Sequence, residues 1–235
     1  MDNILFSVRN LSKTFHKNVV ALNEISFFGK RDSIIGIVGP NGSGKTTLLS
    51  IFAGLIRQDH GSIEMEKNLS IGASVGDISY FPHLTALENL NFIARLKGLN
   101  KRLAEGELKK LLGLVGLDYN KKANTFSFGM RQRYAIASTM VGAPDIILLD
   151  EPTVGIDPID IEEIKEVIKR SAADRSLIFS SHQLEEVLAL SDYVLGLSYG
   201  QMLFFENIEA IKEAARERQL NAKQYLLEQM KASQL

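Results

Sequence analysis

The residues with the clearest capacity for chemistry lie between Gly39 and Leu49, in the segment GPNGSGKTTLL, which follows the apolar run SIIGIV directly. This segment fits the pattern G-x-x-x-x-G-K-[ST], in which backbone N–H groups surround the phosphates of a nucleoside triphosphate. Glycines are needed because a side chain at a tight position would prevent the backbone from approaching a phosphate closely. The pattern predicts a phosphate-binding loop made of Gly39, Pro40, Asn41, Gly42, Ser43, Gly44, Lys45, Thr46 and Thr47.

Lys45 and Thr46 are the residues of this loop whose side chains would act on the ligand. A helix that begins at Lys45 directs the positive end of its dipole at the same phosphates. Lys45 then reaches the β- and γ-phosphates, and the Thr46 hydroxyl binds Mg²⁺. A glycine-rich turn that only joins a strand to a helix is the alternative interpretation of the segment.

A second chemical segment is DIILLDEPT, which runs from Asp145 to Thr153. Four apolar residues predict a buried strand, and Asp150 and Glu151 follow at the carboxyl edge, where open α/β sheets bind ligands. We expect Asp150 to hold Mg²⁺ through water and Glu151 to polarise a hydrolytic water. Acids that follow a buried strand are unusual unless a ligand compensates their charge, which argues against an ordinary surface pair.

Short β-branched and apolar runs predict the strands that position these groups. Helical patterns lie between the runs, so the strands should form a mainly parallel sheet. The predicted strands are Ile34–Val38, Ile146–Leu149, Leu177–Ser180 and Tyr193–Leu197.

Other segments predict a different structure. Ile4–Leu11 and Ala21–Phe28 read as antiparallel strands joined by the polar loop SKTFHKN. Helical periodicity extends from Thr85 to about Gly116, with Thr85 as N-cap and Glu88 as its capping-box partner. After Asn207 the pattern predicts one or two charged helices, which dock or are solvated rather than forming a coiled coil, since no sustained heptad is present.

Composition excludes several classes of protein. The 235 residues are 45% hydrophobic, and 27 basic against 28 acidic residues leave a formal charge of −1, so no nucleic acid partner is expected. The absence of cysteine excludes a disulfide framework and thiolate chemistry. The start MDNILFSV does not resemble a signal peptide, and no run of eighteen apolar residues occurs. Any role at a membrane should therefore depend on a partner.

Several further motifs carry a resemblance to a known family. FSFGMRQR (Phe126–Arg133), VGIDP (Val154–Pro158) and SSHQ (Ser180–Gln183) follow the phosphate loop in the same chain as Asp150 and Glu151. Together these motifs resemble the ATP-binding subunits of ABC transporters, over about Leu5 to Gln201. FPHLTALENL and GMRQR are most similar to bacterial exporter subunits of the drug, antibiotic-resistance and bacteriocin-immunity type.

The resemblance implies roles for residues outside the phosphate loop. Phe15 would stack on adenine, and His182 would touch the γ-phosphate, so that Glu151, His182 and Lys45 form the catalytic set. Ser127 and Gly129 would present a hydroxyl and backbone N–H groups to the γ-phosphate on the opposite subunit. Asp157 would lie in a loop that crosses between subunits. These roles require a dimer, which could be a homodimer or a heterodimer.

Two positions depart from the family pattern. The first lies in the loop that, in the family, links Mg²⁺ to the membrane partner. The family has glutamine there, or glutamate in some exporters, whereas this chain has Gly76, with Asp77 beside it. Either Asp77 substitutes as a metal ligand or the coupling is looser. The second lies in the family's signature motif, which here is Phe126–Met130. It reads Phe-Ser-Phe-Gly-Met, with Phe128 at a place where the commonest form has glycine.

The predicted fold is α/β, a P-loop NTPase with a RecA-like core, an antiparallel β edge and a helical lobe at about 84–133. A nucleotide-binding domain should span 1–205 and a helical tail 206–235. The resemblance implies an ATPase that uses ATP and Mg²⁺ and drives transport through a separate membrane permease at the cytoplasmic face of the cell membrane, with export as the expected direction. The alternatives are a soluble ABC ATPase of translation or DNA repair, and a P-loop kinase; Glu151 with His182 favours water as the nucleophile.

Overall fold

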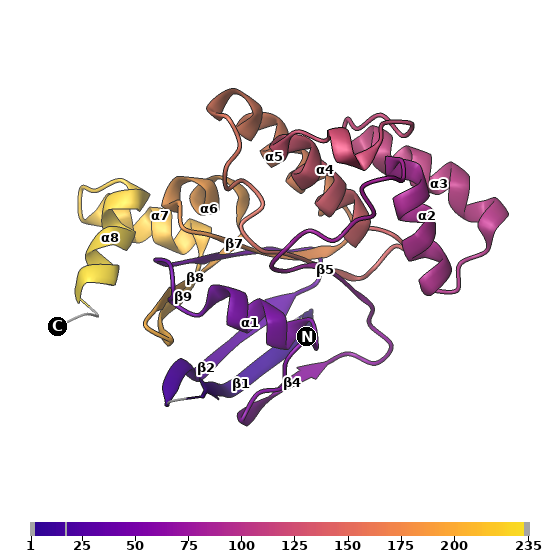
Figure 1. The fold of residues 1–235 in the computed structure, drawn as a ribbon. Coiled ribbons are helices and arrows are strands. Elements are labelled where there is room, and N and C mark those ends of the chain that lie inside the picture. The colour runs from indigo at the N-terminus through magenta and orange to yellow at the C-terminus, as the bar shows by residue number, and fades with distance from the viewer. Residues whose placement is uncertain (1–2, 17, 233–235) are drawn as a thin grey trace.

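Two β-sheets organise the chain, which the computed structural model describes at residues 3–16 and 18–232. Within these residues the larger sheet has the strand order β5-β6-β7-β3-β8-β9, and the smaller sheet the order β2-β1-β4. Helix α1 (Lys45–Phe52) lies between the two sheets (Figure 1). The strands are β1 (Ile4–Phe15), β2 (Val19–Lys30), β3 (Ile34–Val38), β4 (His60–Met65), β5 (Ile71–Ser74), β6 (Ile146–Leu149), β7 (Ser176–Ser181), β8 (Tyr193–Ser198) and β9 (Gln201–Asn207).

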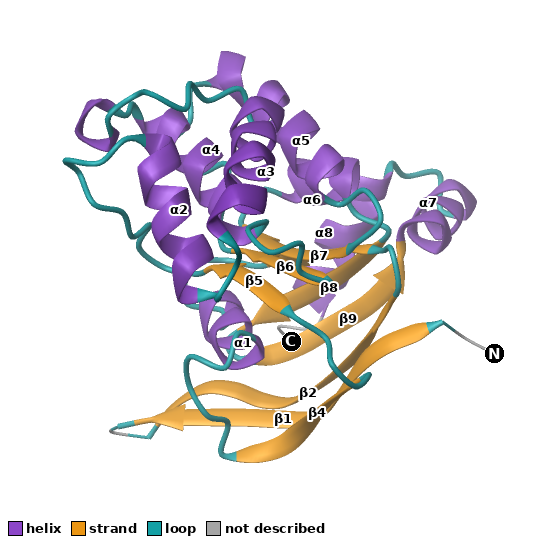
Figure 2. Cartoon of the chain, turned by 90° about the vertical axis from the view of Figure 1, so that its right-hand side faces the viewer, coloured by secondary structure: helices purple, strands orange, loops and turns teal. Residues whose placement is uncertain are grey.

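The other helices lie on the side of the large sheet that points away from α1 (Figure 2). Of these, α2 and α3 pack on α4 beyond the β5 edge of the sheet (Figure 1). Each face of this sheet therefore has its own hydrophobic core. Leu48 and Phe52 of α1 pack with strand residues on one side, and Leu112, Ile164 and Val187 belong to the core on the other. The remaining helices are α2 (Ala86–Leu96), α3 (Lys101–Leu114), α4 (Phe128–Thr139), α5 (Pro158–Ser171), α6 (Leu184–Leu190), α7 (Ile208–Glu217) and α8 (Ala222–Ala232).

The parallel sheet predicted from the apolar runs is confirmed. β6, β7, β3 and β8 are adjacent and parallel, and β3, β6 and β7 are buried along almost their whole length because helices or the second sheet cover both faces. β5 extends the sheet in parallel, whereas β9 pairs antiparallel with β8 at the other edge. This order puts the carboxyl end of β7 between those of β3 and β6, so residues after β7 lie between the phosphate loop and the acidic pair.

The predicted loop SKTFHKN between the first two strands was wrong. Most of it is strand, because β1 continues to Phe15 and pairs Phe15 with Val19 of β2. Asp59 stabilises this extension, since its carboxylate accepts hydrogen bonds from the Lys13 ammonium at 2.9 Å and from the Thr14 N–H at 2.7 Å. Phe15 is consequently the last residue of a strand and not a loop residue.

The predicted helix start at Thr85 is confirmed. The Thr85 hydroxyl accepts the Glu88 N–H at 3.2 Å, and the Glu88 carboxylate accepts the Thr85 N–H at 2.7 Å, which completes a capping box at the start of α2. These backbone and hydroxyl hydrogen bonds hold the pKa of Glu88 below its usual range. The lobe boundary at 133 stays a prediction, and α4 crosses it, reaching Thr139 against Gly72 of β5.

The segment after Asn207 forms α7 and α8, as its periodicity predicts. Ile211 and Leu226 are fully buried in the larger core, so these helices pack on the body of the protein. Lys223 of α8 pairs with Glu185 of α6. Within the described residues, none of the helices combines the length and the apolar character that a bilayer crossing requires.

Candidate functional site

The loop between β3 and α1 has the form that phosphate binding needs. A Cβ on Gly39 would lie 2.2 Å from the Leu197 carbonyl oxygen, and one on Gly44 would lie 2.5 Å from that of Ala21. Gly44 also has φ 107°, which side chains rarely permit. Gly44 is the N-cap of α1 and, as a glycine, has no side chain that could cap the first turn. The N–H groups at the start of α1 therefore remain available to an anion.

Lys45 is held at the bottom of this loop, with only 5% of its surface exposed. Its ammonium donates to the carbonyl oxygens of Gly39 at 2.8 Å and Pro40 at 3.1 Å. The ammonium also lies 3.3 Å from a carboxylate oxygen of Glu151. A buried cation held by neutral carbonyls and one carboxylate is suited to a polyanionic ligand, because water screens the attraction little.

Asp150 and Thr46 form the candidate magnesium site. The Thr46 hydroxyl donates to Asp150 at 2.8 Å, and the Ser180 hydroxyl donates to the other carboxylate oxygen at 2.6 Å. Within the described residues no group of three or more His, Cys, Asp or Glu could hold a metal ion. One hydroxyl and one carboxylate nevertheless suit Mg²⁺, which usually takes its other ligands from phosphates and water.

Glu151 lies between Lys45 and His182. His182 Nδ1 is 2.9 Å from one carboxylate oxygen of Glu151, and the His182 N–H donates to the same oxygen at 3.3 Å. Glu151 adopts the left-handed conformation, with φ 47°, and its N–H donates to the Ser180 hydroxyl at 2.9 Å. A strained backbone fixed by neighbouring strands is common where a side chain must point into a site.

A pocket of about 430 Å³ brings most of the predicted nucleotide residues together. Phe15 lies at its side, 42% exposed, with the Lys13 ammonium 5.6 Å from the ring centroid. An exposed ring beside a phosphate loop can stack on a nucleobase. The predicted residues that line the pocket are Phe15, Asn41, Gly42, Gly44, Lys45, Thr46, Thr47, Glu151 and His182.

The predicted residues Ser127, Gly129 and Asp157 are absent from the described lining of this pocket. Ser127 is the exposed N-cap of α4, where its oxygen accepts the Met130 N–H at 3.3 Å and its own O–H remains free to donate. The Phe128 ring packs against Gly155, where an added Cβ would lie 3.0 Å from the ring. Exposed helix-start groups of this kind can reach a ligand on another molecule.

Replacing Ser127 and Phe128 should have different effects. Ser127→Ala is expected to lower the rate of nucleotide hydrolysis about five- to hundredfold, or about 1 to 3 kcal/mol, because the resemblance implies that its hydroxyl is aimed at the γ-phosphate on another subunit. Phe128→Gly should change the rate less than about threefold, because the Phe128 N–H remains and only a half-exposed ring is lost. Both rates are measured at saturating ATP.

Thr85→Ala is the control, since it removes a helix N-cap of the same kind from α2 without touching the signature. Its rate should match the parent's, which separates lost capping from lost catalysis. If the parent is inactive and Phe128→Gly restores its activity, the expectation is wrong. The active protein would then be a heterodimer in which a related nucleotide-binding subunit supplies the functional counterpart of Ser127–Gly129.

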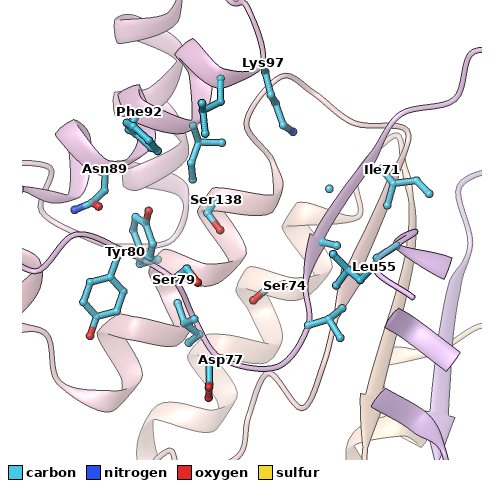
Figure 3. A pocket seen from close by; sticks show the side chains of 18 of the residues that line it. Leu55, Ile71, Ser74, Asp77, Ser79, Tyr80, Asn89, Phe92, Lys97 and Ser138 are labelled. Carbon is cyan, nitrogen blue, oxygen red and sulfur yellow. The ribbon is translucent and has the colours of Figure 1, made fainter. Parts of the chain in front are cut away.

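A second concave surface, of about 590 Å³, lies between α2, β5 and the segment after β5, and we call it the lobe groove (Figure 3). Leu55, Phe92 and Leu96 contribute exposed apolar side chains to it. Figure 3 shows Lys97 and Asp77 at opposite ends. The Lys97 ammonium donates to the Val141 carbonyl at 2.7 Å, and partial burial lowers its pKa.

Gly76 and Asp77 occupy the segment that should link metal and membrane partner. Gly76 has φ 73° and open space around its Cα, and Asp77 is exposed and lines the lobe groove. In the described part of the chain, no hydrogen bond joins Asp77 to Thr46 or Asp150. The Asp150 N–H does donate to the Ser74 carbonyl at 2.9 Å, which ties the start of this segment to the acidic pair. A metal-binding role for Asp77 stays a prediction.

Ser180 is a site residue that sequence reasoning did not assign. Its hydroxyl contacts both members of the acidic pair, as donor to Asp150 and as acceptor from the Glu151 N–H. The available signal was its position, because a hydroxyl at the end of a buried strand, two residues before His182, needs a polar partner.

Comparison with known proteins gives consistent matches. The sequence model of a family described as "ABC transporter" matches residues 22–154. The ABC transporter ATP-binding protein NatA of Bacillus subtilis (strain 168) is 35% identical over 219 residues, which cover 87% of this chain and 89% of NatA. The linearmycin resistance ATP-binding protein LnrL of the same organism is 33% identical over 212 residues, covering 85% of this chain and 68% of LnrL. The dimeric structure of MJ0796, a bacterial ABC transporter cassette, superposes with a TM-score of 0.78 at 24% identity, over 87% of this chain and 99% of the cassette.

Proposed function

The chain belongs to the ABC transporter family as an ATP-binding subunit that hydrolyses ATP, and we propose that it drives export through a separate membrane permease. Export is supported by the relative LnrL, which is named as a linearmycin resistance ATP-binding protein, since resistance of this kind fits removal of the compound from the cell. The subunit would then work at the cytoplasmic face of the cell membrane, attached through the permease. Neither the site nor the relatives support a soluble machine of translation or DNA repair.

The nucleotide would bind between Phe15 and the phosphate loop. Phe15 stacks on adenine, the N–H groups at the start of α1 bind phosphate oxygens, and Lys45 holds the β- and γ-phosphates. Mg²⁺, held by Thr46 and Asp150, would neutralise phosphate charge. The observation that best supports this arrangement is that Phe15, Lys45, Glu151 and His182 line the same pocket.

Hydrolysis would depend on Glu151 as the group that takes a proton from the attacking water. One carboxylate oxygen faces Lys45 and the other faces His182, so the carboxylate is held in one orientation. His182 is placed to contact the γ-phosphate and to keep Glu151 aimed at the water. A fixed carboxylate removes the need to reorganise during the reaction.

A second nucleotide-binding subunit would complete each site. Ser127 at the start of α4 is exposed and Gly129 is partly exposed, so both are open to another chain, and Asp157 is an exposed N-cap of α5 whose side chain makes no capping hydrogen bond. Phe128 packs on Gly155, so the signature and the Val154–Asp157 loop would meet the partner as one surface. The partner is a second copy or a related cassette.

The permease would dock in the lobe groove. Leu96 is 74% exposed, and Leu55 and Phe92 lie beside it, which is a large apolar area to leave in water. Among the described residues, the Lys97 ammonium donates to a backbone carbonyl and pairs with no acidic side chain. A permease segment with an apolar face and an acidic side chain near Lys97 would fit this groove.

Leu96→Gln tests the docking proposal. The chain is coexpressed with the permease encoded beside its gene, and the permease that co-purifies with it is measured. The amount recovered with Leu96→Gln should be at least about tenfold lower than with the parent, because an exposed apolar anchor is lost. The ATPase rate of the isolated variant should stay within about twofold of the parent, since the side chain is on the surface.

Leu227→Gln is the matched control, because Leu227 is another exposed leucine, on α8 and 39% exposed, outside the groove. Its permease yield should equal the parent's. Equal losses for both variants, or none for Leu96→Gln, would contradict docking in the lobe groove.

A further inference from the structure

A buried carboxylate lies behind the Glu151–His182 contact. Glu186, in the first turn of α6, is only 3% exposed. One of its oxygens accepts hydrogen bonds from the Thr153 hydroxyl at 2.6 Å and from the Ser181 hydroxyl at 2.7 Å. Its other oxygen is buried and has no hydrogen-bond partner in the described chain.

The two hydroxyls belong to the two segments that carry the reacting groups. Thr153 follows Glu151 by two residues, and Ser181 directly precedes His182. The Ser181 oxygen also accepts the Gln183 N–H at 3.0 Å, so the backbone on the other side of His182 is fixed as well. One carboxylate oxygen thus links the end of β7 to the loop after β6.

A buried carboxyl group with an unpaired oxygen costs stability, so the fold gains nothing evident from placing glutamate here. The neighbouring Glu185 shows the ordinary alternative, because it is exposed and pairs with Lys223, and this pairing holds its pKa below the usual range. Rigidity of the site is the property that the Glu186 link does supply.

We infer that Glu186 is a positioning residue for ATP hydrolysis, which sets the placement of the His182 ring against the Glu151 carboxylate. The inference rests on the proposed roles of Glu151 and His182. Glu186 itself touches neither the reacting groups nor the pocket lining, and it acts through Thr153 and Ser181. Because reacting groups misplaced by about 1 Å can cost about 100-fold in rate, a loosened link should affect kcat more than ATP binding.

The first test compares adjacent glutamates. Glu186→Ala should lower kcat about 10- to 100-fold while the KM for ATP changes less than about threefold. Glu185→Ala should leave kcat within about twofold, because it loses only a surface ion pair. Glu186→Gln should recover most of the rate, since the amide oxygen can accept both hydroxyls. Rates are normalised to the fraction of chains that bind ATP.

A second pair of variants covers the case in which Glu186→Ala fails to fold. Ser181→Ala and Ser171→Ala each remove a fully buried hydroxyl, but the Ser171 hydroxyl donates to the Val167 carbonyl within α5. Ser181→Ala should lower kcat about three- to tenfold and Ser171→Ala less than about twofold. Equal effects of the two serines on kcat would overturn the inference.

A double-mutant cycle separates this inference from the function on which it rests. In a His182→Ala background, Ser181→Ala should cost less than about twofold, because the group that it positions is gone. If His182→Ala alone leaves the rate unchanged, the proposed role of His182 fails. If His182→Ala is slow but the Ser181→Ala loss is undiminished in that background, only the positioning role of Glu186 is wrong.

Discussion

Glu151→Gln should bind ATP as the parent does but hydrolyse it at least about 100-fold more slowly. The amide has nearly the shape of the carboxylate, so contacts with Lys45 and His182 can persist in altered form. It cannot accept a proton from water as a carboxylate can, so the chemical step is slowed. Turnover at saturating ATP and the equilibrium Kd for ATP check the two halves of this expectation.

Glu162→Gln is the control, because Glu162 is an exposed acid that pairs with Lys165 on α5. Its turnover should match the parent's. A Glu151→Gln variant that keeps most of the parental rate would show that another group activates the water.

The same variant should reveal the dimer. If Ser127 and Gly129 complete the site on another copy, uncleaved ATP holds two chains together, so sedimentation should show monomers without nucleotide and dimers with ATP. A dimer that forms without nucleotide would place the interface elsewhere, for example on the charged helices α7 and α8.

Lys45→Ala should weaken ATP binding itself, with a Kd about 10- to 150-fold higher, because hydrogen bonds to charged groups contribute about 1.5 to 3 kcal/mol and this ammonium is buried. The substitution also leaves Glu151 without its cation at 3.3 Å. Negative charge would then face the incoming phosphates unopposed. Equilibrium binding of ATP measures the effect independently of turnover.

Lys165→Ala is the matched control, since Lys165 pairs with Glu162 on the surface of α5. It should bind ATP like the parent. Tight binding of ATP by Lys45→Ala would mean that the backbone N–H groups of the loop carry the affinity, and the role assigned to Lys45 would have to be given up.

Local features of the chain were predictable because their causes are local. The phosphate loop needs only a strand, closely spaced glycines and a helix in sequence, and β3 and α1 supply them at the expected residues. The start of α2 was predictable for the same reason, since both capping-box hydrogen bonds join Thr85 to Glu88, three residues away.

Strand pairing was less predictable. The polar residues of SKTFHKN read as a loop, yet Asp59, more than forty residues away, holds Lys13 and Thr14 in β1. β9 was missed, and it pairs only because β8 precedes it at a sheet edge. In both cases the deciding partner lies outside the segment, so periodicity within the segment could not identify it.

The sequence by itself determined which groups this protein can use: a phosphate loop, a lysine, an acidic pair after a buried strand and a histidine after another. Only the tertiary structure decided how they meet, because the order β6-β7-β3 puts Ser180 and His182 between the loop and the acids. Glu185 and Glu186 illustrate the limit. They are neighbours of one residue type in one short helix, yet packing against β7 leaves one paired at the surface and buries the other between Thr153 and Ser181.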